Sequence, residues 1–86
     1  MYSIMFSKRA VADIAKLRTA GLDKKAKNLI ELLKINPYQS PLRFEKLKGE
    51  LNGALSRRIN IQHRLVYQVI EDEKIIKIIM MWTHYE

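Results

Sequence analysis

The hydrophobic periodicity of the chain changes at Asn36-Pro37, and this change constrains the fold more than any other sequence feature. Before it, apolar residues recur at the three- and four-residue intervals of amphipathic helices. After it, three short segments are rich in β-branched and aromatic residues, which is typical of strands. The helical part ends here because a residue that precedes proline is disfavoured in the α region. The sequence therefore predicts helices followed by a sheet.

One strand and two helices are predicted before this break. Residues 2–6 indicate a short strand, and Ser7 then offers a side-chain oxygen at a helix N-cap position. A first helix is predicted over residues 8–20, with Gly21 as its stop. A second helix, with a regular apolar stripe, is predicted over residues 22–35. Joined by a tight turn, the two helices make a helical hairpin.

Three strands are predicted after the break, over residues 55–61, 64–70 and 74–83, with the acidic residues 71–73 at one turn. We expect them to form an antiparallel meander, which the N-terminal strand can join at an edge. The helical hairpin then covers one face of the sheet. The whole chain, residues 1–86, is expected to be a single α+β domain with the element order β-α-α-β-β-β.

The residue types that the chain lacks exclude several chemistries. Its 86 residues include no Cys, which removes disulfides, thiolate metal sites and Cys nucleophiles. His63 and His84 are too few for a three-His zinc site, and the 3 glycines are too scattered to cradle a phosphate. We therefore expect no metal and no cofactor.

The sequence carries no signal for export or membrane insertion. The N-terminus lacks the charged start and the long apolar stretch of a signal peptide. The longest apolar block, residues 75–82, is interrupted by Lys77 and is shorter than the roughly 20 residues that a membrane span needs. We therefore expect a cytoplasmic protein.

The chain is basic, with 16 Lys and Arg against 9 Asp and Glu and a formal net charge of +7. This charge favours a polyanionic partner, either nucleic acid or an acidic protein segment. A basic protein that is merely kept soluble by its charge is the alternative. Much of the charge lies in one stretch that contains only two acids, and its basic residues are Arg43, Lys46, Lys48, Arg57, Arg58 and Arg64.

Alternation along the first of the three predicted strands separates two adjacent arginines. Arg58 falls on the polar face, where it can reach a ligand. Arg57 falls on the apolar face, where we expect an edge residue that reaches solvent or pairs with an acid. Arg64 opens the next strand, and two roles stay open for it: bidentate binding of a phosphate, or a structural ion pair with Glu45 or Glu50.

The chain also contains the groups that RNA cleavage requires. RNA carries its own nucleophile, the 2′-hydroxyl, so the reaction needs no metal, only a base, an acid for the leaving 5′-oxygen and cations for the transition state. Glu45 can supply the base and His84 the acid, with Arg64 and Lys48 as the cations. Tyr85, next to the acid, can stack on a base or donate a hydrogen bond. For this chemistry the five side chains have to converge in space.

The chain resembles the Txe/YoeB family of toxin–antitoxin toxins, in the RelE-like superfamily, over essentially its whole length in layout, with the strong motifs in the half from Glu45 to Tyr85. The motifs that carry the resemblance are Phe44-Glu45-Lys46-Leu47-Lys48, Ser56-Arg57-Arg58-Ile59-Asn60, His63-Arg64-Leu65-Val66-Tyr67 and His84-Tyr85. The resemblance implies a small RelE-like domain that acts as a ribosome-dependent mRNA endoribonuclease. It also implies silencing by an antitoxin of the YefM/Axe type, and an acidic, partly disordered antitoxin segment fits the charge of +7. A homodimer and a toxin–antitoxin hetero-oligomer are both compatible with it.

The resemblance also implies a role for each residue that matches a functional position of the family. Glu45 is implied as the general base, His84 as the general acid and Arg64 as the arginine that stabilises the transition state. Tyr85 would orient the substrate, and Lys48 would contact a phosphate. The other basic residues expected to bind RNA or its phosphates are Arg58, Lys46 and Arg57.

The C-terminus departs from the family pattern in two ways. Glu86 follows the His-Tyr pair at which family members commonly end, and Trp82-Thr83 precedes the pair in place of a basic and an aromatic residue. Neither departure removes a proposed catalytic group. Two other functions are weighed against the nuclease: a ParE-like toxin that inhibits a protein target such as gyrase, and a non-catalytic module that binds RNA or the ribosome.

Overall fold

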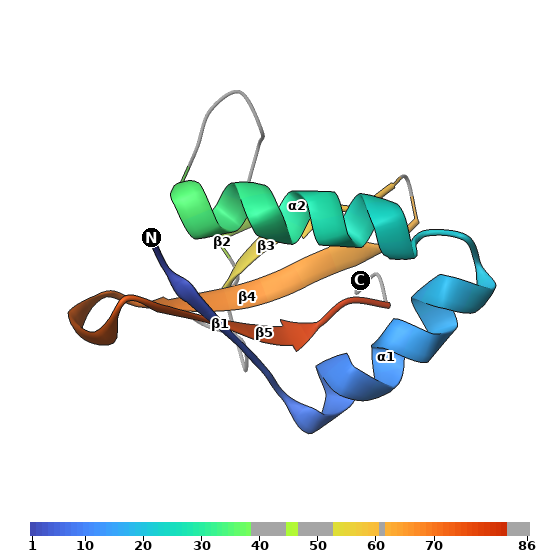
Figure 1. Cartoon of the computed structure of the whole chain (residues 1–86), viewed down its shortest axis with the longest axis horizontal. Helices are drawn as coiled ribbons and strands as arrows, with labels where there is room; N and C mark the ends of the chain where they lie inside the picture. Colours follow the sequence, from blue (N-terminus) through green and yellow to red (C-terminus); the bar gives the residue numbers. More distant parts are fainter. Residues whose placement is uncertain (39–44, 47–52, 61, 83–86) are drawn as a thin grey trace.

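The computed structural model of the protein describes residues 1–38, 45–46, 53–60 and 62–82, with the backbone alone for residues 45 and 46. Within these ranges the chain forms two helices and five strands (Figure 1). The helices are α1 (Lys8–Thr19) and α2 (Asp23–Ile35). The strands are β1 (Ser3–Phe6), β2 (Glu45–Lys46), β3 (Leu55–Arg58), β4 (Arg64–Ile70) and β5 (Ile75–Met80).

The strands form one sheet in the order β1-β5-β4-β3-β2. Strands β2 to β5 pair antiparallel, which confirms the predicted meander and the α+β fold. Strand β1 joins at the edge, as expected, but it runs parallel to β5, so the sheet is mixed. No hairpin turn links β1 to β5, and a strand that is not held by such a turn can take either direction. Strand β2 is an addition that the sequence did not indicate.

Two predicted strands end earlier in the structure than in the sequence reading. Strand β3 stops at Arg58 because the backbone N–H groups of Ile59 and Asn60 turn to donate to the carbonyl of His63, at 2.8 and 3.3 Å. Strand β5 stops at Met80. The turn predicted at the acidic residues 71–73 lies between β4 and β5, and it is a short 3-10 helix.

The start of α1 is fixed by the predicted N-cap residue. The Ser7 hydroxyl oxygen accepts a hydrogen bond from the backbone N–H of Ala10 at 3.0 Å. The same hydroxyl donates to the carbonyl of Ile79 at 2.6 Å. One side chain therefore caps the helix and ties its first turn to β5.

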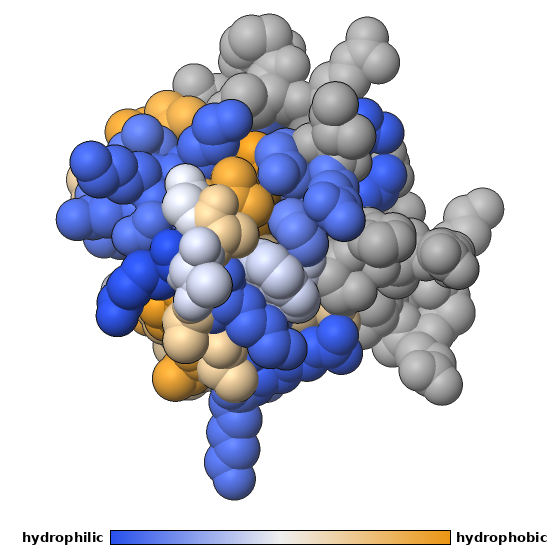
Figure 2. Space-filling model, turned by 90° about the vertical axis from the view of Figure 1, so that its right-hand side faces the viewer, coloured by the Kyte–Doolittle hydropathy of each residue, from blue (hydrophilic) through white to orange (hydrophobic). Residues whose placement is uncertain are grey.

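Both helices contribute to a core on one face of the sheet. Figure 1 shows α2 running along the sheet and α1 beside the end of β5. The core is formed by Ala10 and Leu17 of α1, Ala26, Leu29 and Leu33 of α2, and Leu55, Ile59, Leu65, Tyr67, Ile76, Ile78 and Met81 from the sheet region. Figure 2 views the molecule from the end where α1 meets α2, and many of the side chains coloured there are hydrophilic.

A second, smaller cluster lies on the other face and contains Ala54, Val66 and Met80. Since Val66 is fully buried there, this face is also packed around its centre. In the part of the chain that the structure describes, no helix is long and apolar enough to cross a lipid bilayer.

Candidate active site

The sheet face away from the helices gathers several of the positions that the sequence selects for RNA chemistry. Arg58 on β3 lies directly in register with Arg64 on β4. Two residues earlier on β3, Ser56 pairs with Val66 on one side and with Glu45 of β2 on the other. The backbone of the candidate base thus lies beside Ser56, and Arg58 follows two residues further along β3, a step of about 7 Å. Arg64 lies across from Arg58 on the next strand.

The two arginines differ in their surroundings. Arg58 is exposed, while Arg64 is half-buried at the first position of β4. Like charges that lie directly opposite each other on neighbouring strands destabilise the pairing. Two guanidinium groups in this arrangement favour an anion between or beside them, and a phosphate is the anion that arginine binds with two parallel hydrogen bonds.

Ser56 lies at the centre of this face and is buried, with 2% of its surface exposed. Its hydroxyl has no hydrogen-bond partner among the described residues. Buried hydroxyls are usually hydrogen-bonded, and the register sets the backbone of Glu45 beside this one.

The structure corrects the prediction for Arg57. Its side chain is only 2% exposed and lies on the helix side of the sheet, so it does not face a ligand. Its Nη2 donates to the Pro37 carbonyl at 2.9 Å, and its Nε donates to the Tyr67 hydroxyl at 3.1 Å. The expectation of an edge residue was wrong because the segment that follows α2 and Tyr67 of β4 enclose the guanidinium on the helix side of the sheet. Arg57 is a structural cation in the core.

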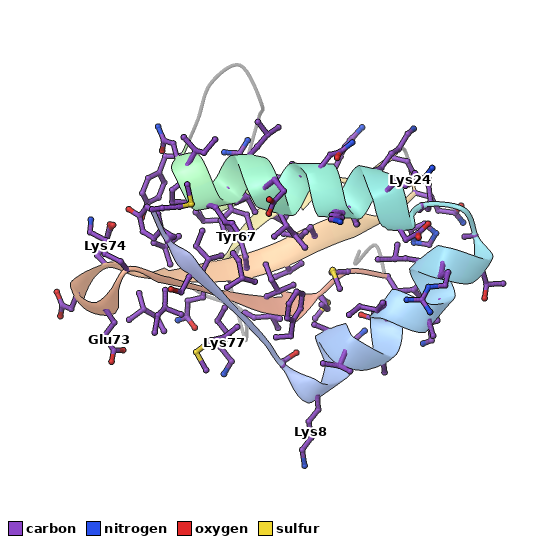
Figure 3. The ribbon with its side chains drawn as sticks, in the orientation of Figure 1. Lys8, Lys24, Tyr67, Glu73, Lys74 and Lys77 are labelled. Carbon is purple, nitrogen blue, oxygen red and sulfur yellow. The ribbon has the colours of Figure 1, made fainter. Side chains whose placement is uncertain are left out.

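Tyr67 completes this buried hydrogen-bond group. Its hydroxyl donates to the Pro37 carbonyl at 2.7 Å, and Figure 3 shows its ring between α2 and the sheet. Burial raises the pKa of the Tyr67 hydroxyl, and the hydrogen bond from Arg57 opposes that rise in pKa. The phenol therefore stays protonated and keeps donating to the carbonyl. Together, Arg57 and Tyr67 attach the segment that follows α2 to the sheet.

The end of β5 is held by a buried carboxylate on α1. Asp13 is 2% exposed, and its Oδ2 accepts hydrogen bonds from the backbone N–H groups of Met81 at 3.0 Å and Trp82 at 3.3 Å. Lys16 lies 3.9 Å from the other carboxylate oxygen. The carboxylate thus acts as a cap for a strand end, as an N-cap does for a helix.

Trp82 is held on its other side by His63. The Nδ1 of His63 hydrogen-bonds to the Trp82 carbonyl, and the two rings stack with centroids 4.1 Å apart and an interplanar angle of 20°. The backbone N–H of His63 in turn donates to Asn60 Oδ1 at 2.6 Å. The turn between β3 and β4 is therefore linked to the residue that follows β5.

The sequence reasoning missed both Asp13 and His63. The available signal for Asp13 was its position between Ala10 and Leu17 on the face of α1 that packs on the sheet. A charged residue at such a position has to find a partner in the core. No comparable local signal marks His63, because its contact lies 19 residues further along the chain.

Several predicted site residues cannot be placed. Lys48, His84 and Tyr85 lie outside the described residues, as do the side chains of Glu45 and Lys46. The ion pair considered between Arg64 and Glu45 or Glu50 also falls outside them. The register of β2 locates the backbone of Glu45 beside Ser56, and that of Lys46 beside Leu55.

A known family matches nearly the whole chain. The family of YoeB-like toxins of bacterial type II toxin-antitoxin systems matches residues 6–85. The chain belongs to this family. Toxin YoeB of Escherichia coli K12 is 42% identical over 53 residues, which span 62% of this chain and 63% of that toxin. Toxin YoeB of Streptomyces coelicolor is 40% identical over a segment of the same length, again 63% of that protein.

Solved structures of YoeB toxins have the same fold over the full length. The YoeB/ParE toxin from Agrobacterium tumefaciens superposes with a TM-score of 0.86 at 28% identity, covering 96% of this chain and 99% of that one. The toxin in a YoeB-YefM complex from Staphylococcus aureus superposes with a TM-score of 0.81 at 35% identity, covering 99% of each chain. The resemblance to the Txe/YoeB family and its RelE-like fold is thus confirmed.

Proposed function

We propose that this YoeB-family toxin cleaves mRNA on the ribosome by general acid–base catalysis without a metal. The observation that supports this most is the register of β2, β3 and β4. It sets the backbone of Glu45 beside Ser56, one step from the opposed pair of Arg58 and Arg64. A glutamate whose backbone lies near two arginines on one sheet face is suited to a reaction that removes a proton close to a phosphate.

The proposed reaction uses the 2′-hydroxyl of the RNA as the nucleophile. Glu45 takes the proton from the 2′-hydroxyl while the 2′-oxygen attacks the adjacent phosphorus. The bond from phosphorus to the 5′-oxygen breaks, and His84 gives a proton to that oxygen. The products are a 2′,3′-cyclic phosphate and a 5′-hydroxyl end. Arg64 stabilises the negative charge that builds up on the phosphoryl oxygens.

The remaining cations bind and position the RNA. Arg58, which is exposed, contacts a phosphate from the sheet face. Lys46 and Lys48 are proposed to bind further phosphates, and Tyr85 to orient the substrate. Arg57 is left out of this set because its guanidinium is buried and bonded to Pro37 and Tyr67.

We propose that the ribosome holds the RNA in the geometry that cleavage requires. A carboxylate is a weak base for a sugar hydroxyl, so the rate depends on holding the RNA in a reactive geometry. The 86-residue chain has little surface with which to bend an RNA strand on its own. Messenger RNA held in the ribosomal A site is already extended and oriented. An action on translating ribosomes also places the protein in the cytoplasm.

The partner of the free toxin is proposed to be an antitoxin of the YefM/Axe type. Two of the similar structures from Staphylococcus aureus are a YoeB-YefM complex and a YoeB dimer. A net charge of +7 suits an acidic, partly disordered segment that orders as it covers the basic face. Both a hetero-oligomer with the antitoxin and a toxin homodimer are therefore proposed for this chain.

The test is primer extension on a reporter mRNA in a reconstituted translation mixture, with and without ribosomes. It compares the wild type with His84→Ala and with Lys24→Ala, an exposed lysine on α2 that serves as a matched control (Figure 3). We expect cuts at a fixed codon position that require ribosomes, persist in Lys24→Ala and fall by roughly 100-fold or more in His84→Ala. Intact mRNA with the wild type would contradict the nuclease and favour a protein target such as gyrase.

A further inference from the structure

We infer that Asp13 and His63 are positioning residues that fix Trp82, and through it the point of the chain from which His84 extends. This inference rests on the proposed function, because it concerns the proposed general acid. We call these three residues the Trp82 clamp. Neither Asp13 nor His63 belongs to the set of residues that contacts RNA in the proposed reaction.

Asp13 holds the backbone of Trp82 from the helix side. Burying a carboxylate is unfavourable unless hydrogen bonds compensate for the lost water. Here two backbone N–H groups, those of Met81 and Trp82, both point at Oδ2. Since Met81 is 1% exposed, its N–H needs a partner inside the protein. An apolar residue at position 13 would fill the space but would not bind the two N–H groups that follow β5.

His63 holds the other two groups of Trp82. The Trp82 carbonyl is an acceptor only, so Nδ1 of His63 carries the proton in this hydrogen bond. The stacked rings fix the rotation of the Trp82 side chain. His63 is itself anchored, because the Asn60 side chain binds its N–H and the backbone of Ile59 binds its carbonyl. Asp13 thus binds the N–H of Trp82, and His63 binds its C=O and stacks on its ring.

The Trp82 clamp lies close in the sequence to the proposed general acid, His84. A β-bulge precedes it, with Ile79 as one extra residue between the pairs Tyr67–Ile78 and Val66–Met80, and bulges redirect the strand that carries them. His84 is two residues beyond Trp82 in the sequence, and two residues of chain span at most about 7 Å. A displacement of Trp82 therefore moves the point of the chain from which His84 extends. An error of about 1 Å in a catalytic group can cost about 100-fold in rate.

The test separates the hydrogen bond from the ring stack with two variants of His63. His63→Phe keeps an aromatic ring against Trp82 but removes the donor to its carbonyl. His63→Asn removes the ring but keeps an N–H donor near the place of Nδ1. Trp82 is the only tryptophan of the chain, so its fluorescence reports on the clamp directly. Cleavage of ribosome-bound mRNA is measured in parallel, with kcat and KM determined separately.

We expect His63→Phe to lower kcat by about tenfold or more, with KM changed by less than about twofold. Acrylamide should quench its Trp82 fluorescence more strongly than in the wild type. His63→Asn should recover part of the lost kcat. Tyr2→Phe is the control for lost stability, because it removes a hydrogen bond to Glu71 of 2.5 Å at the turn between β4 and β5. We expect its kcat to equal that of the wild type.

Three results of this experiment would contradict the positioning role of His63. Equal kcat for wild type and His63→Phe, with a wild type that cleaves mRNA, would overturn the positioning role and leave the proposed function intact. Equal losses of kcat in His63→Phe and Tyr2→Phe would also overturn it, since general loss of stability would then explain both. A wild type that leaves mRNA intact would overturn the proposed function and the positioning role together, while the fluorescence would still report whether Trp82 is held.

Discussion

Arg58 and Arg64 lie directly opposite each other on β3 and β4, on the sheet face away from both helices. Two cations at opposed positions repel each other, and an anion relieves that repulsion. This arrangement is suited to a protein that binds a polyanion. It is the feature of the described surface that agrees best with RNA as the ligand.

The first prediction concerns Arg58. Replacement by Ala should weaken binding of single-stranded RNA and lower the slope of log affinity against log salt concentration by about 0.7, the loss of one phosphate contact. Lys8→Ala, at the exposed start of α1 (Figure 3), is the matched control. It removes one charge just after the edge strand β1, which β5 separates from β4 and β3. A salt titration of RNA binding measures both. Equal slopes for the two variants would contradict a specific phosphate contact.

The second prediction concerns Glu45, whose backbone lies beside Ser56. Glu45→Gln keeps the size of the side chain but removes the base, so mRNA cleavage should fall by roughly 100-fold or more. Binding to the ribosome should remain, because a neutral amide does not repel phosphate. Co-sedimentation with ribosomes and primer extension separate the two effects. Full cleavage by this variant would exclude Glu45 as the base.

The third prediction follows from the correction for Arg57. Arg57→Met should lower the free energy of unfolding by about 1 to 3 kcal/mol, because the Pro37 carbonyl and the Tyr67 hydroxyl lose a buried partner. Urea denaturation measures this change. The affinity of the folded variant for RNA should equal that of the wild type. A weaker affinity with unchanged stability would mean that Arg57 reaches the ligand after all.

The fourth prediction concerns pH and Tyr2. The hydrogen bond to Glu71 is the main cause that raises the pKa of Tyr2 from 10.0 to about 12, and burial adds to it. A phenol whose pKa is raised in the folded state stabilises the fold while it is protonated. This stabilisation is complete below pH 10, the ordinary pKa, and is lost as the pH rises to about 12. Urea denaturation of wild type and Tyr2→Phe across this range should show the stability difference disappear.

The sequence predicted the parts of the fold that local patterns determine. The helical stripe, the Ser7 cap and the acidic turn all depend on residues close together in the chain. The direction of β1 was not predictable, because its partner β5 is about 70 residues away and no turn connects the two. The short β2 was missed because two residues are too few to show a period.

For the candidate site, too, local patterns were predictable and contacts between distant parts of the chain were not. Alternation along β3 separated Arg57 from Arg58 correctly, since the two side chains lie on opposite faces. It did not show that Arg57 is buried, because its partners Pro37 and Tyr67 lie 20 and 10 residues away in the chain. Asp13 and His63 were missed because their contacts with Trp82 are made across the fold.

The place of β5 in the sheet has a consequence for synthesis. Strand β5 lies between β1 and β4, and β1 has no other neighbour in the described sheet. The ribosome makes a chain from its N-terminus, so β1 leaves the ribosome long before the strand on which it depends. Helix α1 is in the same situation, because Ser7 and Asp13 both bind the backbone of residues 79–82. A growing chain therefore lacks the finished sheet, and the partners of Ser7 and Asp13, until β5 and the residues that follow it have left the ribosome.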